Sequence, residues 1–302
     1  MIWRKLGQIY KFKPIDNYLL SHASNPLAVR LNDDIYRVFF SGRDKENRSS
    51  IGYVDIDIVK QIVIDTCKNV IFKYGEEESF YSHGVSIGNL YEVENKKYIQ
   101  FMAWQIRNGD HWRGDIGRLS VNDDLKSMKL NPKDIYLKCD KEDQVSLSYP
   151  WIMFDENIYK MWYGSTLNWS SENSEMVHVI KYATSEDGHN WKKHGLAIPY
   201  EIGVAQAFSR PTVLKNENGY HMWFSYRSGD GTKYRIGYAN SLDGGKWNRK
   251  EDSGITVGLK DEWDANMVCY PFVFTHKGQT YMLYNGNEYG KHGFGLALLE
   301  EK

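Results

Sequence analysis

Four titratable side chains that could do acid–base chemistry lie in short segments with small or aromatic neighbours. Asp264 lies in the segment WDANM, and Glu262 comes two residues before it. Asp44 lies in GRDKEN, and His83 lies in YSHGVS, where Gly84 leaves room for a ligand. Two carboxyl groups can act as a general acid and as a base or nucleophile, and histidine titrates near neutral pH. We therefore expect the catalytic residues to be Asp264, Glu262, His83 and Asp44.

Each of these residues also has a structural alternative. Asp44 could belong to a solvated turn, Glu262 could cap a loop, and His83 could be a hydrogen-bonded packing histidine. Other catalytic signatures do not occur: there is no Walker loop, dinucleotide fingerprint, HExxH or GxSxG segment. The three cysteines stand far apart without metal-ligand spacing, and we expect reduced thiols. We expect neither a metal nor a cofactor.

The elements that must position these residues follow a repeat. Five short aromatic runs end in small or polar residues, and the aligned ends lie 62, 60, 62 and 60 positions apart. One apolar run precedes each of them, and another follows. The aromatic runs are VFFSGR (38–43), QFMAWQ (100–105), KMWYGS (160–165), HMWFSY (221–226) and YMLYNG (281–286). Three such segments and a more variable fourth are typical of a β-propeller blade.

We therefore expect an all-β fold: a five-bladed β-propeller with four-stranded blades, in a single domain over residues 1–302. The fifth unit ends without a fourth strand, and WRKLGQI (3–9) resembles WKKHGLAI (191–198), the fourth segment of unit three. The N-terminal strand, about residues 1–12, is expected to complete blade five, because closure removes an open sheet edge. Two S-x-D-G-x-x-W segments (185–191 and 241–247) predict hairpins between third and fourth strands.

In such a ring, the leading residues of the first strands would meet the ends of the second strands at one mouth of a central channel. Aromatic faces there can pack on the C–H surface of a sugar, while amides and guanidinium groups bind its hydroxyls. This pocket would hold one or two sugar rings. The expected substrate-binding residues are His22, Asn25, Arg43, Trp104, Tyr149, Tyr163, Arg210, Tyr226, Arg227, Asn285 and Asn287.

Four residues of the two sets share an offset from the first strand of their blade. Tyr149 and Arg210 immediately precede aligned prolines, while His83 and Asp264 lie a few residues earlier in their units. We expect these four side chains to line one cavity. The arginines of the binding set indicate an acidic sugar or a sugar nucleotide. His111 is expected to lie in a turn.

The repeat, with NP in unit one, RP in unit four and YNGNEYG near the end, resembles the five-bladed propeller glycosidases of glycoside hydrolase families 43, 32, 68 and 130. The resemblance covers nearly the whole chain. Families 43 and 32 imply an Asp in blade one, an Asp in blade two and a Glu in blade three. Asn25 stands where the first Asp is implied, and the other two carboxylates are also missing. Since glycoside hydrolysis normally needs two carboxyl groups, Asp264, Glu262 and Asp44 would supply them from neighbouring blades.

The expected function is glycan processing by a glycoside hydrolase or a phosphorylase that acts on a small glycan or sugar conjugate. The alternative is a catalytically inactive carbohydrate-binding propeller in surface-polysaccharide assembly. With 38 basic and 39 acidic residues, the chain offers neither a broad nucleic-acid surface nor a polybasic membrane patch. It has no apolar segment that could span a bilayer and no apolar leader, so we expect a cytoplasmic protein. The oligomeric state is left open.

Overall fold

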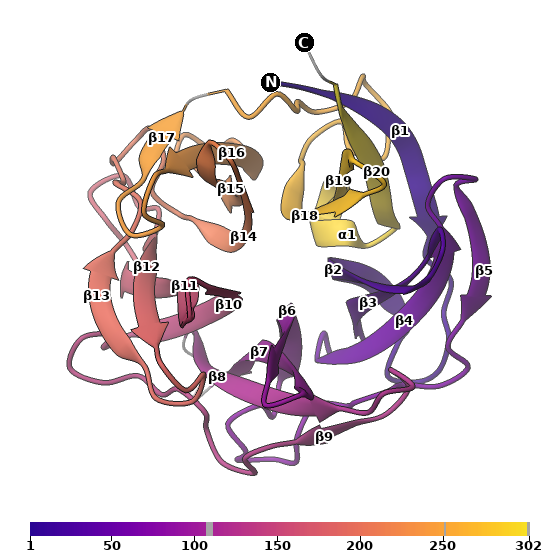
Figure 1. Ribbon diagram of the computed structural model, residues 1–302, viewed down its shortest axis with the longest axis horizontal. Coiled ribbons are helices and arrows are strands. Elements are labelled where there is room, and N and C mark those ends of the chain that lie inside the picture. Colours follow the sequence, from indigo (N-terminus) through magenta and orange to yellow (C-terminus); the bar gives the residue numbers. More distant parts are fainter. Residues whose placement is uncertain (107–110, 251, 301–302) are drawn as a thin grey trace.

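The computed structural model describes residues 1–106, 111–250 and 252–300. Its regular structure is almost all β, and strands that follow one another in a sheet pair antiparallel (Figure 1). Three sheets have four strands. The first contains β10 (Ser146–Asp155), β11 (Ile158–Asn168), β12 (Val177–Ser185) and β13 (Lys192–Leu196); the second contains β14 (Ser209–Asn216), β15 (Gly219–Tyr226), β16 (Arg235–Ser241) and β17 (Asn248–Lys250); the third contains β1 (Ile2–Lys11), β18 (Cys269–His276), β19 (Gln279–Asn285) and β20 (Gly293–Glu300).

The fourth sheet has eight strands, in two groups of four. A single parallel pair, Ser49 with Gly84, joins the groups, so each group is otherwise an antiparallel sheet like the other three. The first group contains β2 (Ser21–Asn32), β3 (Ile35–Arg43), β4 (Ser49–Asp57) and β5 (Ile62–Thr66), and the second contains β6 (Gly84–Val93), β7 (Lys96–Ile106), β8 (Trp112–Val121) and β9 (Met128–Leu130). One short helix, α1 (Asn287–Gly290), follows β19.

The sheets are arranged around a common centre. In Figure 1 the first strands β2, β6, β10, β14 and β18 are innermost, and β5, β9 and β13 are at the periphery. The inner strands contact one another in a closed cycle, in which β18 also contacts β2. The expected blade order, with the first strand innermost, is therefore what the structure shows.

The N-terminal strand completes the last sheet, as expected. β1 pairs antiparallel with β20, from Ile2 opposite Glu300 to Lys11 opposite Gly293. Trp3 is buried and meets Trp223 of the neighbouring sheet edge-on, with ring centroids 5.8 Å apart. The two ends of the chain therefore share one sheet (Figure 1), and β20 has no open edge.

The aromatic residues pack between the sheets. Middle strands are buried along most of their length, and every residue of β4 is buried. Phe39, Phe101, Trp162, Phe224 and Tyr284 are almost wholly shielded from solvent in the middle strands. Because each such ring removes about 150–250 Å² from water, stacking flat sheets through aromatic side chains accounts for the unusual aromatic content.

Both S-x-D-G-x-x-W segments form the expected hairpin turns. Asp187 accepts hydrogen bonds from the backbone N–H groups of His189 and Asn190, and Gly188 has a positive φ of 70°. In the second turn, the indole of Trp247 donates to the carbonyl of Gly244. The turns are structural. The three cysteines of the chain are free thiols, as expected.

Candidate functional site

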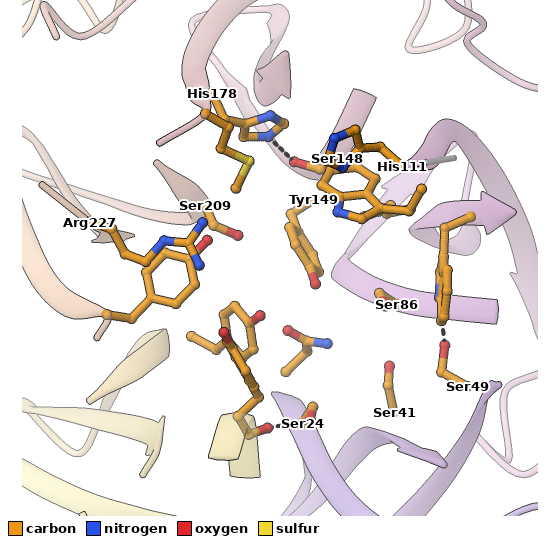
Figure 2. A pocket seen from close by; sticks show the side chains of 18 of the residues that line it. Ser24, Ser41, Ser49, Ser86, His111, Ser148, Tyr149, His178, Ser209 and Arg227 are labelled. Carbon is orange, nitrogen blue, oxygen red and sulfur yellow. Dashed lines mark hydrogen bonds between the residues drawn. The ribbon is translucent and has the colours of Figure 1, made fainter. Parts of the chain in front are cut away.

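A cavity of about 450 Å³ is lined by side chains from all of the sheets (Figure 2). Each first strand contributes at least one residue near its beginning, among them Ser86 of β6, Ser209 of β14 and Tyr270 of β18. The described lining is rich in hydroxyl groups and aromatic rings. Its members are Ser24, Asn25, Ser41, Arg43, Ser49, Ser86, Met102, Trp104, His111, Trp112, Ser148, Tyr149, Trp169, Ser174, Glu175, Met176, His178, Ser209, Arg227, Tyr234, Tyr270 and Tyr289.

A shared backbone irregularity turns residues of the first strands toward the centre. The pairing of each first strand with its neighbour shifts register near the strand's beginning, for example between Ser148 and Trp151. Four non-glycine residues within these shifts have positive φ angles, and each directly precedes a proline: Asn25 (56°), Tyr149 (32°), Arg210 (48°) and Tyr270 (53°). Bulges re-aim side chains next to binding sites, and strained backbone concentrates at functional positions.

A buried histidine orders one wall of the cavity. The Nε2 atom of His178 lies 2.6 Å from Oγ of Ser148, and its Nδ1 lies 2.7 Å from Oγ1 of Thr166 (Figure 2). Burial and, to a smaller extent, the charge of the nearby Arg227 lower the pKa of His178 to about 3. The imidazole is therefore neutral near pH 7, so one ring nitrogen donates a hydrogen bond and the other accepts one. The hydroxyls of Ser148 and Thr166 are held in fixed orientations.

Four tyrosines form a second wall. The rings of Tyr149 and Tyr234 lie 5.7 and 6.1 Å from that of Tyr270, and Tyr289 of α1 lies 6.2 Å from it. Burial raises the pKa of Tyr149, Tyr234 and Tyr270, so these hydroxyls stay protonated. They offer a ligand both aromatic faces and hydrogen-bond donors.

A third group comes from the loops between second and third strands. His111 stacks on Trp169 with centroids 4.8 Å apart and planes 16° apart, and Trp112 meets Trp169 edge-on at 4.7 Å. Trp169 comes from the segment between β11 and β12, whereas His111 directly precedes β8. Across two sheets, the loops thus build an aromatic cluster on the cavity wall. His111 belongs to it, rather than to an ordinary turn as expected.

Glu175 is the one carboxylate among the described lining residues. Its Oε1 accepts a hydrogen bond of 2.8 Å from Nη2 of Arg227, whose guanidinium also lies over the ring of Tyr234 at 4.8 Å. Arg227 directly follows β15, and in Figure 2 it lies on the opposite side of the cavity from Ser49. The pair places one anionic and one cationic group at the same part of the wall.

Five of the expected binding residues line this cavity: Asn25, Arg43, Trp104, Tyr149 and Arg227. Trp104 is fixed by a 2.9 Å hydrogen bond from its indole to Oγ of Ser49. The main chain of Asn25 is fixed too, because its N–H donates to Oδ1 of Asn285. Of the four residues expected to share an offset and one cavity, only Tyr149 lines it, and a binding role for the five residues stays a prediction.

The carboxylates expected to be catalytic lie elsewhere. Asp264 is buried away from the cavity, where it accepts hydrogen bonds from Nζ of Lys5 at 2.6 Å and from the hydroxyl of Tyr284 at 3.0 Å. Glu262 accepts from the backbone N–H of Leu259 within its own turn. The expectation that Asp264 lines the cavity is wrong. Its carboxylate is paired instead with Lys5 of β1, the strand that completes the same sheet.

Asp44 and His83 also take the structural alternatives. Asp44 forms an ion pair with Arg48 at 2.8 Å and accepts backbone hydrogen bonds from Glu46 and Arg48, so it organises a turn. His83 does not line the cavity; its Nδ1 accepts a hydrogen bond from the N–H of Ile106, and its ring lies 5.9 Å from that of Trp104. His83 therefore packs behind a cavity residue.

The side chain of Arg210 does not reach the cavity, contrary to the expectation. It is buried, and its guanidinium donates to the carbonyls of Pro26, Ile87 and Gly88 instead of lining the cavity. Burial lowers its pKa to about 10. His22 is buried at the beginning of β2, and desolvation lowers its pKa to about 3.

The remaining expected binding residues have structural partners. The hydroxyl of Tyr163 donates to Asp143, and Asn287 accepts backbone hydrogen bonds from Asn266 and Met267. Asn285 donates to the carbonyls of Ala23 and Gly293 in addition to holding Asn25. The fourth, Tyr226, lines a smaller depression near β17. None of these four lines the main cavity.

Sequence reasoning missed Glu175, Trp112, Trp169 and His178. Glu175 and Trp169 belong to the connection between the second and third strands of unit three, and Trp112 begins the third strand of unit two directly after such a connection. The repeat treats these connections as variable. A signal was present: runs 160–165 and 180–185 are separated by more residues than the corresponding runs of any other unit. Long connections carry functional residues in many folds. In the part of the chain that the structure describes, no three His, Cys, Asp or Glu side chains form a group that could hold a metal ion.

No family model matches the chain. It is 39% identical over 303 residues to the protein named "Uncharacterized protein Rv1502" of Mycobacterium tuberculosis (strain ATCC 25618 / H37Rv), and the alignment covers 99% of this chain and 100% of that protein. The chain belongs to the same family as Rv1502. A protein of the strain CDC 1551 / Oshkosh, MT1551, also shares 39% identity with it over the same lengths.

The chain shares its fold with solved structures of glycoside hydrolases. A structure named "Glycoside hydrolase" superimposes with a TM-score of 0.78 at 14% identity, covering 99% of this chain and 93% of that one. A second, described with the GH130 family of mannoside phosphorylases, gives 0.68 at 14% identity with the same coverage. A third, sucrose-6-phosphate hydrolase from Lactobacillus gasseri, gives 0.64 at 12% identity, with 96% and 62% covered. The resemblance to propeller glycosidases is thereby confirmed for the fold. None of the described helices is long and apolar enough to cross a membrane.

Proposed function

We propose that this protein processes carbohydrates and binds a small glycan or sugar conjugate in the cavity at the centre of a five-bladed propeller. The blade count follows if the eight-stranded sheet is counted as two blades, because a single residue pair joins its halves. The chain then forms one propeller domain. One observation carries the functional proposal: the bulged first strands direct hydroxyl, amide and aromatic groups into one cavity on a fold shared with glycoside hydrolases.

The chemical composition of the wall suits a sugar. Trp104, Trp112 and Trp169 present ring surfaces for C–H groups, while serine and tyrosine hydroxyls can bind the hydroxyls of a pyranose or furanose. The volume of about 450 Å³ falls within the usual range of roughly 300–1,000 Å³ for small-molecule pockets. A ligand of one or two sugar rings fits this space.

Glu175 is the candidate acid–base group of a glycosidase-type reaction. It is the carboxylate that the described cavity wall offers, and protonation of a leaving oxygen requires such a group. The same observation favours a second candidate, a carbohydrate-binding protein without catalysis. Hydrolysis normally uses two carboxyl groups, and Glu175 is engaged with Arg227.

The substitution Glu175→Gln separates the two candidates. For an enzyme, we expect this change to reduce turnover of a panel of aryl glycosides and short oligosaccharides by about a hundredfold or more, because general acid–base catalysis contributes about 10²–10⁴-fold. The stabilisation of the protein by the same ligands, measured as a thermal shift, should persist. Glu186→Gln, in an exposed turn, is the matched control and should leave both properties unchanged.

The outcomes assign the function. Turnover by the native protein that Glu175→Gln abolishes supports a glycosidase-type enzyme. Ligand binding without turnover in the native protein supports the binding protein. If no member of a broad glycan panel stabilises the protein or is converted by it, the carbohydrate proposal is wrong.

A further inference from the structure

Arg43, the last residue of β3, is a cationic group on the cavity wall whose side chain has no hydrogen-bond or ion-pair partner in the described part of the chain. Three carboxylates that could pair with it are already engaged: Asp44 is next to it in the chain, Glu288 lies near His22 as Arg43 does, and Glu175 lines the same cavity. Asp44 pairs with Arg48 at 2.8 Å, Glu288 pairs with Lys291 at 2.6 Å, and Glu175 pairs with Arg227. The guanidinium of Arg43 is therefore available to a ligand.

The charge balance of the wall points the same way. Among the described lining residues, Arg43 and Arg227 are cationic and Glu175 is anionic, so their sum is one positive charge. His178 does not change this balance near pH 7, because burial keeps its pKa at about 3. Arg43 also helps to keep the nearby His22 neutral, as a minor contribution beside burial. A cavity with excess positive charge favours a negatively charged ligand.

A second side chain of the cavity wall, on the neighbouring strand, has a polar atom without a hydrogen-bond partner. Asn25 lines the cavity with a side chain that is almost completely buried, and its Oδ1 atom has no hydrogen-bond partner. Asn25 belongs to β2, which pairs with β3 so that Ser21 lies opposite Arg43. A buried acceptor without a partner is uncommon in native proteins and costs free energy unless a ligand or water satisfies it.

We propose that the glycan bound in this cavity carries an anionic group, a carboxylate or a phosphate, which Arg43 binds while Oδ1 of Asn25 accepts a hydrogen bond from a sugar hydroxyl. This deepens, and rests on, the proposed carbohydrate function. The planar fork of arginine bonds two oxygens of one anion, and a carboxylate or phosphate presents such a pair. Asn25 contributes selectivity for a hydroxylated ring over a bare anion.

Binding of matched sugars tests the proposal. The probes are glucose, glucuronate and glucose 6-phosphate, the corresponding galactose series, and inorganic phosphate, measured by calorimetry at low and high salt. In at least one series we expect the acidic sugar to bind about tenfold or more tightly than the neutral one, because hydrogen bonds between a guanidinium and an anion are about twice as strong as those between neutral groups. The difference should decrease at high salt.

Variants assign the effect to Arg43. Arg43→Gln should abolish the preference for the acidic sugar, and the variant protein should still bind the neutral sugar. Arg43→Lys should retain part of the preference, because the charge remains but the fork is lost. Arg4→Gln removes an equal charge at an exposed residue of β1 and should leave binding unchanged. Thermal unfolding of each variant establishes that it is folded.

The outcomes distinguish this proposal from the function on which it rests. Equal binding of neutral and acidic sugars, unchanged in Arg43→Gln, overturns the anion site and leaves the carbohydrate function standing. Binding of inorganic phosphate alone, lost in Arg43→Gln, supports the anion site with a free anion as its ligand and contradicts the carbohydrate function. If neither sugars nor phosphate bind, both proposals are wrong.

Discussion

The neutral state of His178 follows from its burial between two hydroxyl groups. Its ring nitrogens lie 2.6 and 2.7 Å from Ser148 and Thr166, and among the residues that the structure describes no carboxylate is bonded to it to stabilise an imidazolium. A buried histidine of this kind contributes a fixed orientation, not a proton, to the cavity. We therefore assign it the role of holding the hydroxyl of Ser148 on the cavity wall.

This assignment predicts how stability depends on pH. In the unfolded chain, His178 takes up a proton near pH 6.5, whereas in the folded protein its pKa is about 3. Between these values the unfolded state binds more protons, so the free energy of unfolding falls as the pH is lowered below 6.5. The contribution of one such histidine is up to about 1.4 kcal/mol per pH unit.

The variant His178→Gln, which can bond both hydroxyls without titrating, should reduce this slope. Urea unfolding at several pH values between about 7 and 5 measures it, a window above the range in which the carboxylates titrate. His22 has a similarly lowered pKa and remains in both proteins, so part of the pH dependence should survive. An unchanged slope in the variant would contradict a neutral, buried His178.

At single residues, the sequence located residues of the cavity wall better than it located candidate acid–base groups. Asn25 and Tyr149 were predictable because a proline marks the same bulge in their units, and the bulge turns the residue before it inward. Asp264 was not predictable, because its partner Lys5 is 259 positions away along the chain. Glu175 lies in a connection whose length varies between units, so alignment of the repeat does not predict which way its side chain points.

The strands and their order could be predicted almost completely, because each unit repeats the same pattern of apolar segments. The match of WRKLGQI to a fourth strand also identified β1 correctly as the partner of β20. The repeat pattern could not predict the ion pair that holds β1 against the rest of its sheet. Lys5 is partly exposed, yet it reaches the buried carboxylate of Asp264, which also accepts a hydrogen bond from Tyr284 of β19.

Asp264→Asn therefore tests whether this residue is structural. The change leaves Lys5 without its counter-charge and should lower the free energy of unfolding by about 1–3 kcal/mol. The loss is limited because the buried charge is the one removed, and the ammonium group of Lys5 that remains is partly exposed to solvent. Urea unfolding gives the magnitude. Glu217→Gln, in the exposed turn between β14 and β15, is the control for loss of a negative charge.

Glycan binding and turnover by Asp264→Asn should equal those of the native protein at temperatures where both are folded, because the carboxylate does not line the cavity. Loss of turnover with unchanged stability would restore Asp264 as a catalytic residue. It would also mean that the cavity described above is not the site of the reaction.

At the scale of the whole molecule, the sheets meet around one buried guanidinium. Arg210 belongs to β14, but it donates to the carbonyl of Pro26 in β2 and to those of Ile87 and Gly88 in β6. Gly88 is required at this crowded point, because a Cβ there would lie 2.3 Å from the carbonyl oxygen of Pro150. The side chain thus links β14 to two other first strands, β2 and β6.

We expect Arg210→Met to weaken the centre of the ring. The methionine side chain matches that of arginine only as far as Nε and lacks the two Nη donors. The principal change is therefore that three buried carbonyls lose their donor, at about 1–3 kcal/mol for each group left unsatisfied. The guanidinium of Arg210 is costly to bury, as its lowered pKa of about 10 indicates. Removing this buried charge offsets part of the stability lost with the hydrogen bonds. We therefore expect a net decrease of about 2 kcal/mol in the free energy of unfolding.

Hydrogen exchange makes the test specific to the ring. In Arg210→Met, the amides near the beginnings of β2 and β6 should exchange faster, although the substituted residue lies in a different sheet from both strands. Arg235→Met is the matched control, because Arg235 also donates to three backbone carbonyls, those of Lys233, Tyr234 and Asn266, but at the partly exposed beginning of β16. Its effect should remain local. If Arg210→Met changes exchange in β14 alone, the guanidinium does not couple the blades, and contacts between their apolar faces are sufficient to hold the ring.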